Sequence, residues 1–283
     1  MNRKYFIIVM LSCLFLQSLD AAEREIAITI DDLPFVGSCN SDPKKLNREK
    51  ERFEKILTVL KEENIPATGF VVAGSIEKGQ FKLLEEFKDA GLILGNHTYS
   101  HRSLNNMSAD QYIADIDRAD KTLTPLFGSE KYFRYPYLAE SSGVRRQQVH
   151  KYLATHQYQI APVSIDSKDY RFNQQLYAIP WRLRAQNLAR IKQRYLAYIW
   201  RQTLYAENEA KKNPNFPAKH ILLIHANLIN SHFLGDIITL YRQRGFHFIS
   251  LKEALTKAAQ ITTSKLAKPQ ITRSSVGFWR RDH

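Results

Sequence analysis

Residues 26–32 read IAITIDD, a mostly apolar run that ends on two adjacent carboxylates. A short run of this kind is typical of a strand that is buried on both faces. The carboxylates of Asp31 and Asp32 repel each other, and burying both is unfavourable unless positive charge compensates them. A metal ion on one and a cationic side chain on the other would compensate both. An exposed turn at the end of a strand is the alternative.

Six further segments are short and mostly apolar, and helical patterns fill the gaps between them. The predicted strands cover 67–74, 92–97, 132–137, 158–166, 220–226 and 246–251. The predicted helices cover 46–63, 81–90 with Gly91 just beyond the end, 108–123 with a capping box from Ser108 to Gln111, 181–212 and 233–244. Strands that alternate with helices predict parallel βα units. Periodicity alone leaves both a closed barrel and an open sheet possible.

The first 22 residues differ from the rest of the chain. Arg3 and Lys4 precede an apolar run that ends at Leu16, and small residues stand just before Glu23. This pattern predicts a secretory signal peptide over 1–22, and hence a secreted or periplasmic protein. An N-terminal membrane anchor that is not cleaved is the alternative.

The composition suits a globular chain with a basic surface. Its 283 residues are enough for one sizeable core, which we assign to a single domain over 23–262, followed by a basic tail over 263–283. The formal net charge of +13 favours polyanionic partners. For an exported protein, a cell wall or an acidic polysaccharide fits better than nucleic acid, although simple solubility explains the charge equally well. Without the first 22 residues only Cys39 remains, so no intramolecular disulfide is expected.

Polar residues follow the predicted strands at their C-terminal ends, where βα folds place their sites. The segment 96–101 reads NHTYSH, with His97 and His101 spaced so that both imidazoles can reach one ion. With one carboxylate of the Asp31–Asp32 pair they supply three ligands that suit Zn²⁺ and leave positions open for water and substrate. Such a histidine pair alone is more often structural.

Three more strand ends carry groups with possible chemistry. Arg134, within FRYPY, would hold and aim the carboxylate of Asp31, although a lone arginine here is more often in a surface ion pair. The segment 166–170 reads DSKDY and offers two further carboxylates. His225 ends an apolar strand and is either a core histidine or, with a carboxylate partner, a general acid.

These five motifs, in this order, resemble those of the polysaccharide deacetylase (NodB-like) family, carbohydrate esterase family 4. The resemblance covers residues 26–250 and implies an α/β fold, a distorted β/α barrel of about seven parallel strands. It implies a metal-dependent hydrolase that removes N-acetyl groups from amino sugars of a polysaccharide such as peptidoglycan or a chitin-like oligomer. An O-acetyl esterase, a small-amide hydrolase of the same fold, and a non-catalytic module that binds cell walls are the alternatives.

The resemblance also implies a role for each motif residue. The implied metal ligands, for Zn²⁺ or another divalent ion such as Co²⁺, are Asp32, His97 and His101. The implied catalytic residues are Asp31 as base, His225 as general acid, Arg134 as the group that orients the base, and Asp169 as the carboxylate that tunes the acid. The implied pocket residues are Tyr137, whose backbone N–H is the oxyanion donor, with Tyr170 and Leu223 lining the acetyl pocket.

Three positions depart from the family pattern. Leu33 and Leu138 stand where glycine is usual, and Tyr170 stands where tryptophan is usual. No catalytic group is lost, but the shape of the pocket, and with it the substrate, is left open. The basic segment 181–212 exceeds what the motifs need, and we expect an ordinary packed helix there, with a role in the substrate cleft as the alternative.

Overall fold

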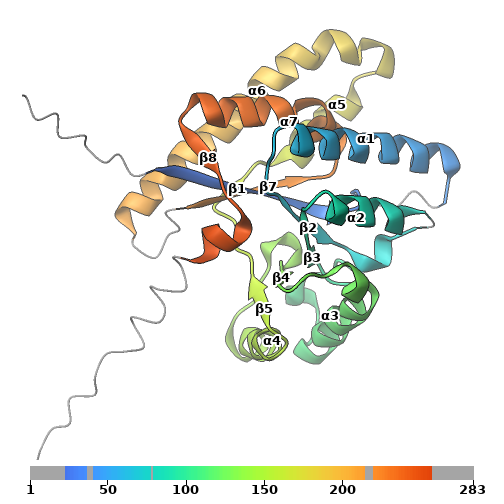
Figure 1. The fold of residues 1–283 in the computed structure, drawn as a ribbon, viewed down its shortest axis with the longest axis vertical. Coiled ribbons are helices and arrows are strands. Elements are labelled where there is room, and N and C mark those ends of the chain that lie inside the picture. Colours follow the sequence, from blue (N-terminus) through green and yellow to red (C-terminus); the bar gives the residue numbers. More distant parts are fainter. Residues whose placement is uncertain (1–22, 37–40, 78, 214–218, 257–283) are drawn as a thin grey trace, which may run out of the picture.

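The computed structural model describes residues 23–36, 41–77, 79–213 and 219–256 (Figure 1). The predicted signal peptide, the thiol of Cys39 and the predicted basic tail lie outside the described residues, so those predictions stay untested. Within the described ranges, no helix combines the length and the apolar character needed to cross a membrane.

The described strands form one parallel sheet that curls into an open barrel. The order is β5-β4-β3-β2-β1-β7-β6, with β8 paired to β1. The strands are β1 (Arg24–Leu33), β2 (Thr68–Val71), β3 (Ile93–Asn96), β4 (Lys131–Phe133), β5 (Tyr158–Ile160), β6 (Ile165–Asp166), β7 (His220–His225) and β8 (Phe246–Phe248). The pairings that join these strands are parallel. The α/β class and the distorted barrel expected from the resemblance are confirmed.

Helices pack on the outside of this sheet (Figure 1). They are α1 (Pro43–Glu62), α2 (Gln80–Asp89), α3 (Ala109–Leu123), α4 (Gly143–Thr155), α5 (Asp169–Ala178), α6 (Trp181–Lys212) and α7 (Leu228–Gln243). The predicted capping box of α3 is present, and Gly91 follows α2 with a φ of 79°. The bounds predicted for the long basic helix are those of α6. Helix α7 begins at Leu228 rather than at 233, because the side chain of Asn227 caps its N-terminus.

The predicted strand 158–166 is wrong as a single strand. The chain leaves the sheet after β5 and returns at β6, and the carbonyl oxygens of Ala161 and Pro162 accept hydrogen bonds from the Arg134 guanidinium. Proline has no N–H to give to a sheet. The interruption therefore turns two backbone carbonyl groups towards the interior of the barrel, where they accept hydrogen bonds from the buried guanidinium of Arg134.

Strand β1 places the first carboxylate by simple alternation. Ile26, Ile28 and Ile30 pack into the large core between sheet and helices, whereas Ala27 packs into the small cluster inside the barrel. Side chains alternate along a strand, so Asp31 shares the interior face with Ala27. Its position at the C-terminal end of β1 brings it to the mouth of the barrel.

Leu33, the first departure from the family pattern, lies in the core below the site. It is buried, and a Cβ built on Gly69 of β2 would lie 2.1 Å from its Cδ1. Leu33 therefore occupies the space that a side chain at position 69 would need. It does not line the pocket described below, so this departure alters the core and not the pocket wall.

Candidate active site

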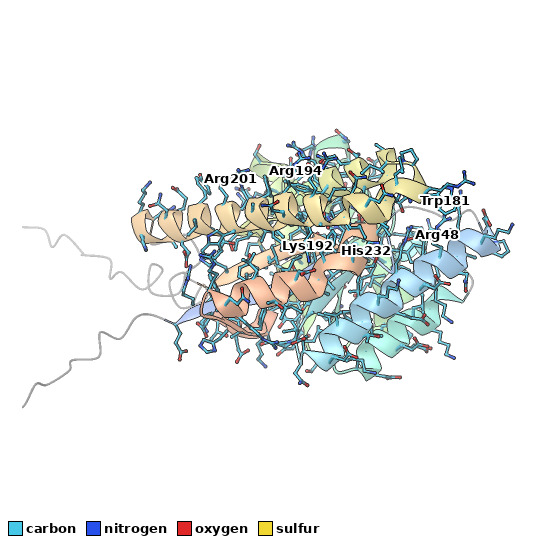
Figure 2. All side chains as sticks on the ribbon, turned by 90° about the horizontal axis from the view of Figure 1, so that it is seen from above. Arg48, Trp181, Lys192, Arg194, Arg201 and His232 are labelled. Carbon is cyan, nitrogen blue, oxygen red and sulfur yellow. The ribbon has the colours of Figure 1, made fainter. Side chains whose placement is uncertain are left out.

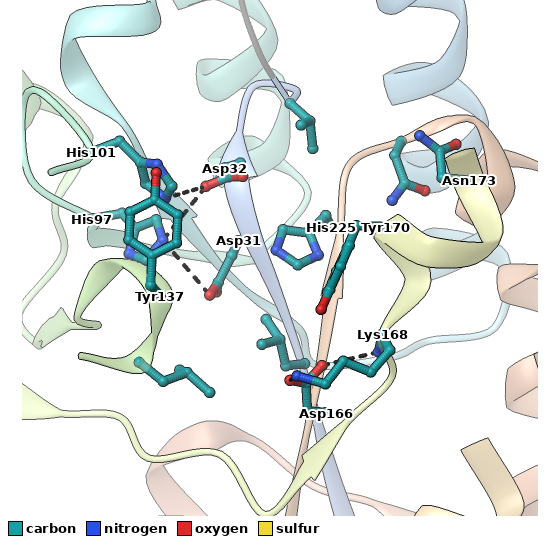
Figure 3. A pocket seen from close by; sticks show the side chains of 14 residues that line it. Asp31, Asp32, His97, His101, Tyr137, Asp166, Lys168, Tyr170, Asn173 and His225 are labelled. Carbon is teal, nitrogen blue, oxygen red and sulfur yellow. Dashed lines mark hydrogen bonds and ion pairs between the residues drawn. The ribbon is translucent and has the colours of Figure 1, made fainter. Parts of the chain in front are cut away.

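A pocket of about 480 Å³ opens at the C-terminal ends of the strands (Figure 3). Most of the residues predicted for the site line it: Asp31, Asp32, His97, His101, Tyr137, Tyr170, Leu223 and His225. The two remaining predicted residues, Arg134 and Asp169, lie behind this wall and contact Asp31 and His225. The structure thus brings together residues that are spread over almost 200 positions of the sequence.

One side of the pocket gathers two imidazoles around a carboxylate. Nε2 of His101 lies 3.0 Å from Oδ1 of Asp32, and Nε2 of His97 lies 3.5 Å from the same oxygen. The ligand atoms of these three residues all lie within 4.8 Å of one another. One ion can contact all three, as the sequence predicted.

The chemistry of these side chains fits a divalent cation. Nδ1 of the buried His97 lies 2.8 Å from the carbonyl oxygen of Arg134. A proton on Nδ1 donates to that oxygen and leaves the lone pair of Nε2 facing the carboxylates. Burial lowers the pKa of His97 despite the nearby charges of Asp31 and Asp32, which favours the neutral form that binds metals.

The surroundings of the Asp32 carboxylate also suit a bound divalent cation. Its buried Oδ1 has no hydrogen-bond partner, although a buried polar atom normally has one. Burial opposes the ionisation of Asp32, but the adjacent imidazoles of His101, His97 and His225 hold its pKa well below the usual range. A cation at this point would bind an oxygen whose neighbours, the Nε2 atoms of His101 and His97, are themselves potential ligands.

Arg134 holds Asp31 from inside the barrel. Its guanidinium is fully buried, and Nη1 donates to Oδ1 of Asp31 at 2.8 Å and to Oγ1 of Thr29 at 2.6 Å. Nε and Nη2 donate to the carbonyl oxygens of Ala161 and Pro162, each at 3.2 Å. The guanidinium therefore has one fixed orientation and engages only one oxygen of Asp31. The other oxygen, Oδ2, faces the histidine side of the pocket.

The opposite side of the pocket pairs His225 with Asp169. Nδ1 of His225 lies 2.7 Å from Oδ1 of Asp169, and the backbone N–H of His225 donates to Oδ2 at 2.7 Å. Burial alone would lower the pKa of His225. The charge and hydrogen bond of Asp169, with smaller contributions from Asp32 and Asp31, instead raise this pKa to about 10. The imidazole is therefore held protonated near pH 7.

Two asparagines that sequence reasoning missed complete the surroundings of Asp169. Nδ2 of Asn227 donates to Oδ2 at 3.0 Å, and Nδ2 of Asn230 donates to the same oxygen at 2.5 Å. The hydroxyl of Tyr195 on α6 donates in turn to Oδ1 of Asn230 at 2.8 Å. In the sequence, these donors are indicated by two asparagines that stand three residues apart, just after His225.

Left-handed backbone conformations cluster around the pocket. Asp32, His101, Tyr137, Leu138 and Lys168 line it, and each has a φ between 50° and 61°. Such conformations are unfavourable for residues other than glycine by about 1–3 kcal/mol each, and they concentrate at functional sites. At Asp32 the left-handed turn breaks the alternation of β1, so that both adjacent carboxylates line the same pocket.

The predicted acetyl-pocket residues line the wall at different depths. Leu223 is buried, Tyr170 is 41% exposed and Tyr137 is 70% exposed. The Tyr137 ring lies 4.8 Å from the ring of His101, measured between centroids. Leu138 and Tyr170, two of the departures from the family pattern, both shape this wall. The oxyanion role of the Tyr137 N–H stays a prediction.

Fold and site together define a parallel β/α barrel with a candidate metal centre of one aspartate and two histidines. The chain belongs to the polysaccharide deacetylase family, whose model matches residues 18–159. The matched range includes the Asp31–Asp32 pair, both histidines of the metal cluster and Arg134. His225 and Asp169 lie beyond it, and the structure places them beside the other side chains.

Two curated relatives are bacterial deacetylases. The peptidoglycan-N-acetylglucosamine deacetylase of Bacillus cereus is 29% identical over 150 residues, 53% of this chain and 47% of the relative. The peptidoglycan-N-acetylmuramic acid deacetylase PdaA of Bacillus subtilis is 31% identical over 201 residues, 71% of this chain and 65% of the relative. The chain thus spans about half to two thirds of the length of these relatives.

A solved structure shares the fold. It is BA3943 of Bacillus anthracis, described as a pseudoenzyme of carbohydrate esterase family 4, with a TM-score of 0.59 and 16% identity. The similarity covers 83% of this chain and 66% of that chain. The fold of this family is therefore found both in deacetylases and in a protein described as a pseudoenzyme.

Proposed function

We propose that this protein is a metal-dependent hydrolase that removes N-acetyl groups from amino sugars of a polysaccharide such as peptidoglycan or a chitin-like oligomer. One observation carries the proposal. A single pocket holds a three-ligand cluster, a carboxylate fixed by Arg134 and an imidazole held protonated by Asp169. The relatives named as peptidoglycan deacetylases support the substrate class.

The first half of the reaction needs an activated carbonyl and an activated water. A divalent ion, Zn²⁺ being the best match, would be held by Asp32, His97 and His101, and would polarise the carbonyl and lower the pKa of water. Asp31 would accept the proton of the attacking water on Oδ2, because Oδ1 is engaged by Arg134. The fixed guanidinium keeps this acceptor aimed at the pocket.

The second half needs a proton for the leaving group. An amine is expelled from a tetrahedral centre only once its nitrogen is protonated, and His225, held protonated by Asp169, is a proton donor on that side of the pocket. The backbone N–H of Tyr137 would donate a hydrogen bond to the developing oxyanion. Acetate and a free amino sugar result. An ester needs the proton of His225 less, so O-acetyl cleavage is the nearest alternative reaction.

Mass spectrometry tests the proposal directly. Zn²⁺-loaded protein is incubated with N-acetylglucosamine oligomers and with peptidoglycan fragments that also contain N-acetylmuramic acid. Each acetyl group replaced by hydrogen lowers the mass by C₂H₂O, and tandem spectra locate the sugar that lost it. The expected result is loss from at least one of these substrates, abolished by a chelator and restored by Zn²⁺.

A non-catalytic module that binds cell walls is the second candidate, because a solved structure of similar fold is described as a pseudoenzyme. The intact pairs Asp31–Arg134 and His225–Asp169 argue against it, since binding alone requires neither. Metal-loaded protein that sediments with cell walls, yet releases acetate from no amide or ester, would establish this second function.

Export from the cytoplasm is part of the same proposal, because a polysaccharide of the wall lies outside the membrane. The support is the basic and apolar pattern of the first 22 residues. N-terminal sequencing of exported protein should begin within a few residues of Glu23. Protein that keeps Met1 and fractionates with membranes would establish the anchored alternative.

A further inference from the structure

Helix α6 carries more positive charge than its packing requires. Between Trp181 and Ala206 it contains no aspartate or glutamate. The same stretch contains six cationic residues, which are Arg182, Arg184, Arg190, Lys192, Arg194 and Arg201. A solvated helix face normally mixes both signs of charge. The imbalance therefore points to a ligand of negative charge.

Three of these arginines form a line on the exposed face of the helix. Arg190, Arg194 and Arg201 are exposed, and spacings of four and eleven residues return to nearly the same side of an α-helix. At 1.5 Å per residue, the line is about 16 Å long. Figure 2 shows Arg194 and Arg201 on the side of α6 away from α7, whereas Lys192 lies on the side facing α7. We call these three arginines the α6 stripe.

The α6 stripe has no anionic partner within the described part of the chain. Arg190 donates only to the neutral amide of Asn187, at 3.0 Å, and Arg201 lies 5.2 Å from the centre of the Tyr198 ring. The side chain of Arg194 makes no hydrogen bond or ion pair with any described residue. All three guanidinium groups therefore keep donors free for an outside anion.

Carboxylates on α6 and on the neighbouring helix α7 are engaged by other cations. Asp236 on α7 binds Lys192 at 3.0 Å, and Glu207 on α6 binds Arg24 at 2.6 Å. These ion pairs turn the acidic groups towards other cations. The positive charge of the stripe is thus not neutralised locally, and a linear anion would meet three guanidinium groups in succession.

An exposed aromatic side chain extends the stripe at its C-terminal end. Tyr205, one turn after Arg201 and on the same side of α6, is 61% exposed. An aromatic ring gives a flat apolar face for a sugar ring, while guanidinium groups bind carboxylates. A lipid surface would instead require a continuous apolar face beside the cations, and the exposed line of α6 has arginines at its centre.

We propose that the α6 stripe binds an acidic polysaccharide. The site recognises a polymer that combines sugar rings with regularly spaced carboxylates, and it lies on the outer surface of the barrel, apart from the pocket. The inference stands whether or not the pocket hydrolyses amides. Its role would be to hold the protein on an anionic polymer.

The test compares two variants of equal net charge, with polygalacturonate as the probe. The stripe variant carries R190Q, R194Q and R201Q. The control variant carries K61Q, K82Q and K151Q, which remove exposed charges from α1, α2 and α4. Binding of the purified full chain is measured by calorimetry at low and high salt. Neutral dextran and vesicles of phosphatidylglycerol with phosphatidylcholine serve as competing surfaces, and circular dichroism verifies that both variants are folded.

The unchanged protein should bind polygalacturonate and not dextran, with an affinity that falls as salt rises. The stripe variant should lose about tenfold or more in affinity, and the control variant less than about threefold. Equal losses would reduce the stripe to one part of a generally basic surface and overturn the proposal. Binding to the vesicles without binding to polygalacturonate would overturn it in favour of a membrane, and binding to neither would overturn it altogether.

Discussion

The two sides of the pocket accommodate buried charge in opposite ways. On the histidine side, Oδ1 of Asp32 is buried with no hydrogen-bond donor. On the other side, the carboxylate of the buried Asp169 has four hydrogen-bond donors among the described residues. They are the backbone N–H and Nδ1 of His225 and the side-chain amides of Asn227 and Asn230. The first side leaves an acceptor open to a group from outside the chain, and the second is complete by itself. Removing side chains from each should therefore have different consequences.

The largest effect is expected on the incomplete side. Substituting His97 by alanine removes one of three ligands, so bound Zn²⁺ should fall from near one equivalent to near none. Hydrolysis should fall by more than the 10- to 100-fold that is typical when a residue supporting a ligand is lost. Metal content measured by mass spectrometry, with circular dichroism for the fold, checks this. Stoichiometric metal retained in the variant would contradict the ligand assignment.

A second, slightly smaller effect separates the two adjacent carboxylates. Asp31→Asn should leave the metal in place, because Asp32 is the expected ligand, and should still remove nearly all turnover, since the water loses its proton acceptor. Amide and activated ester substrates should suffer alike, because both need the same attacking water. The kcat/KM values for both substrates decide it, together with metal content. Loss of the metal would show that Asp31 is also a ligand.

On the complete side, His225→Ala should also retain the metal, with a loss near the 10²–10⁴-fold typical of a positioned general acid. The loss should be larger for an amide than for an activated acetyl ester, because an alkoxide leaves more readily without a proton than an amine anion does. Equal losses on both substrates would mean that His225 does not protonate the leaving group.

The smallest expected effect concerns the pH at which kcat/KM of the unchanged protein begins to fall. Since Asp169 raises the pKa of His225 to about 10, the protonated form should persist through neutral pH, and kcat/KM should fall only as the pH rises towards that value. The charge of a bound cation would move this limb below pH 10, yet it should stay above the ordinary histidine pKa of about 6.5. A limb near 6.5 would show that Asp169 does not hold the proton.

Most of the fold could be predicted because its signals are local. The apolar run of β1, the capping box of α3 and the bounds of α6 each depend on residues close in sequence. Helices α4 and α5 were not predicted. The first buries only Val149 and Leu153 as large apolar residues, which is too few for a clear helical pattern, and the second begins with residues that serve the pocket.

The motifs indicated the three candidate metal ligands that the structure brings together, but they did not indicate the supporting contacts. The two asparagines reach Asp169 across 58 and 61 positions of the sequence, so only the folded chain shows that they are its donors. The break between β5 and β6 is similar. Pro162 signals an interruption, but its reason, the guanidinium of Arg134 27 and 28 positions earlier, is visible only in three dimensions.

The packing of Leu33 against Gly69 restricts the order in which this chain could acquire its residues. Leu33 in its present conformation leaves no room for a Cβ at position 69, because that atom would lie 2.1 Å from Cδ1 of Leu33. Alanine at position 69 therefore requires the Leu33 side chain to move or to be replaced by a smaller residue. A double-mutant cycle with L33A and G69A would show this dependence as a non-additive change in the free energy of unfolding. Two positions without catalytic groups would then change together over evolutionary time, because each sets which residues the other can accept.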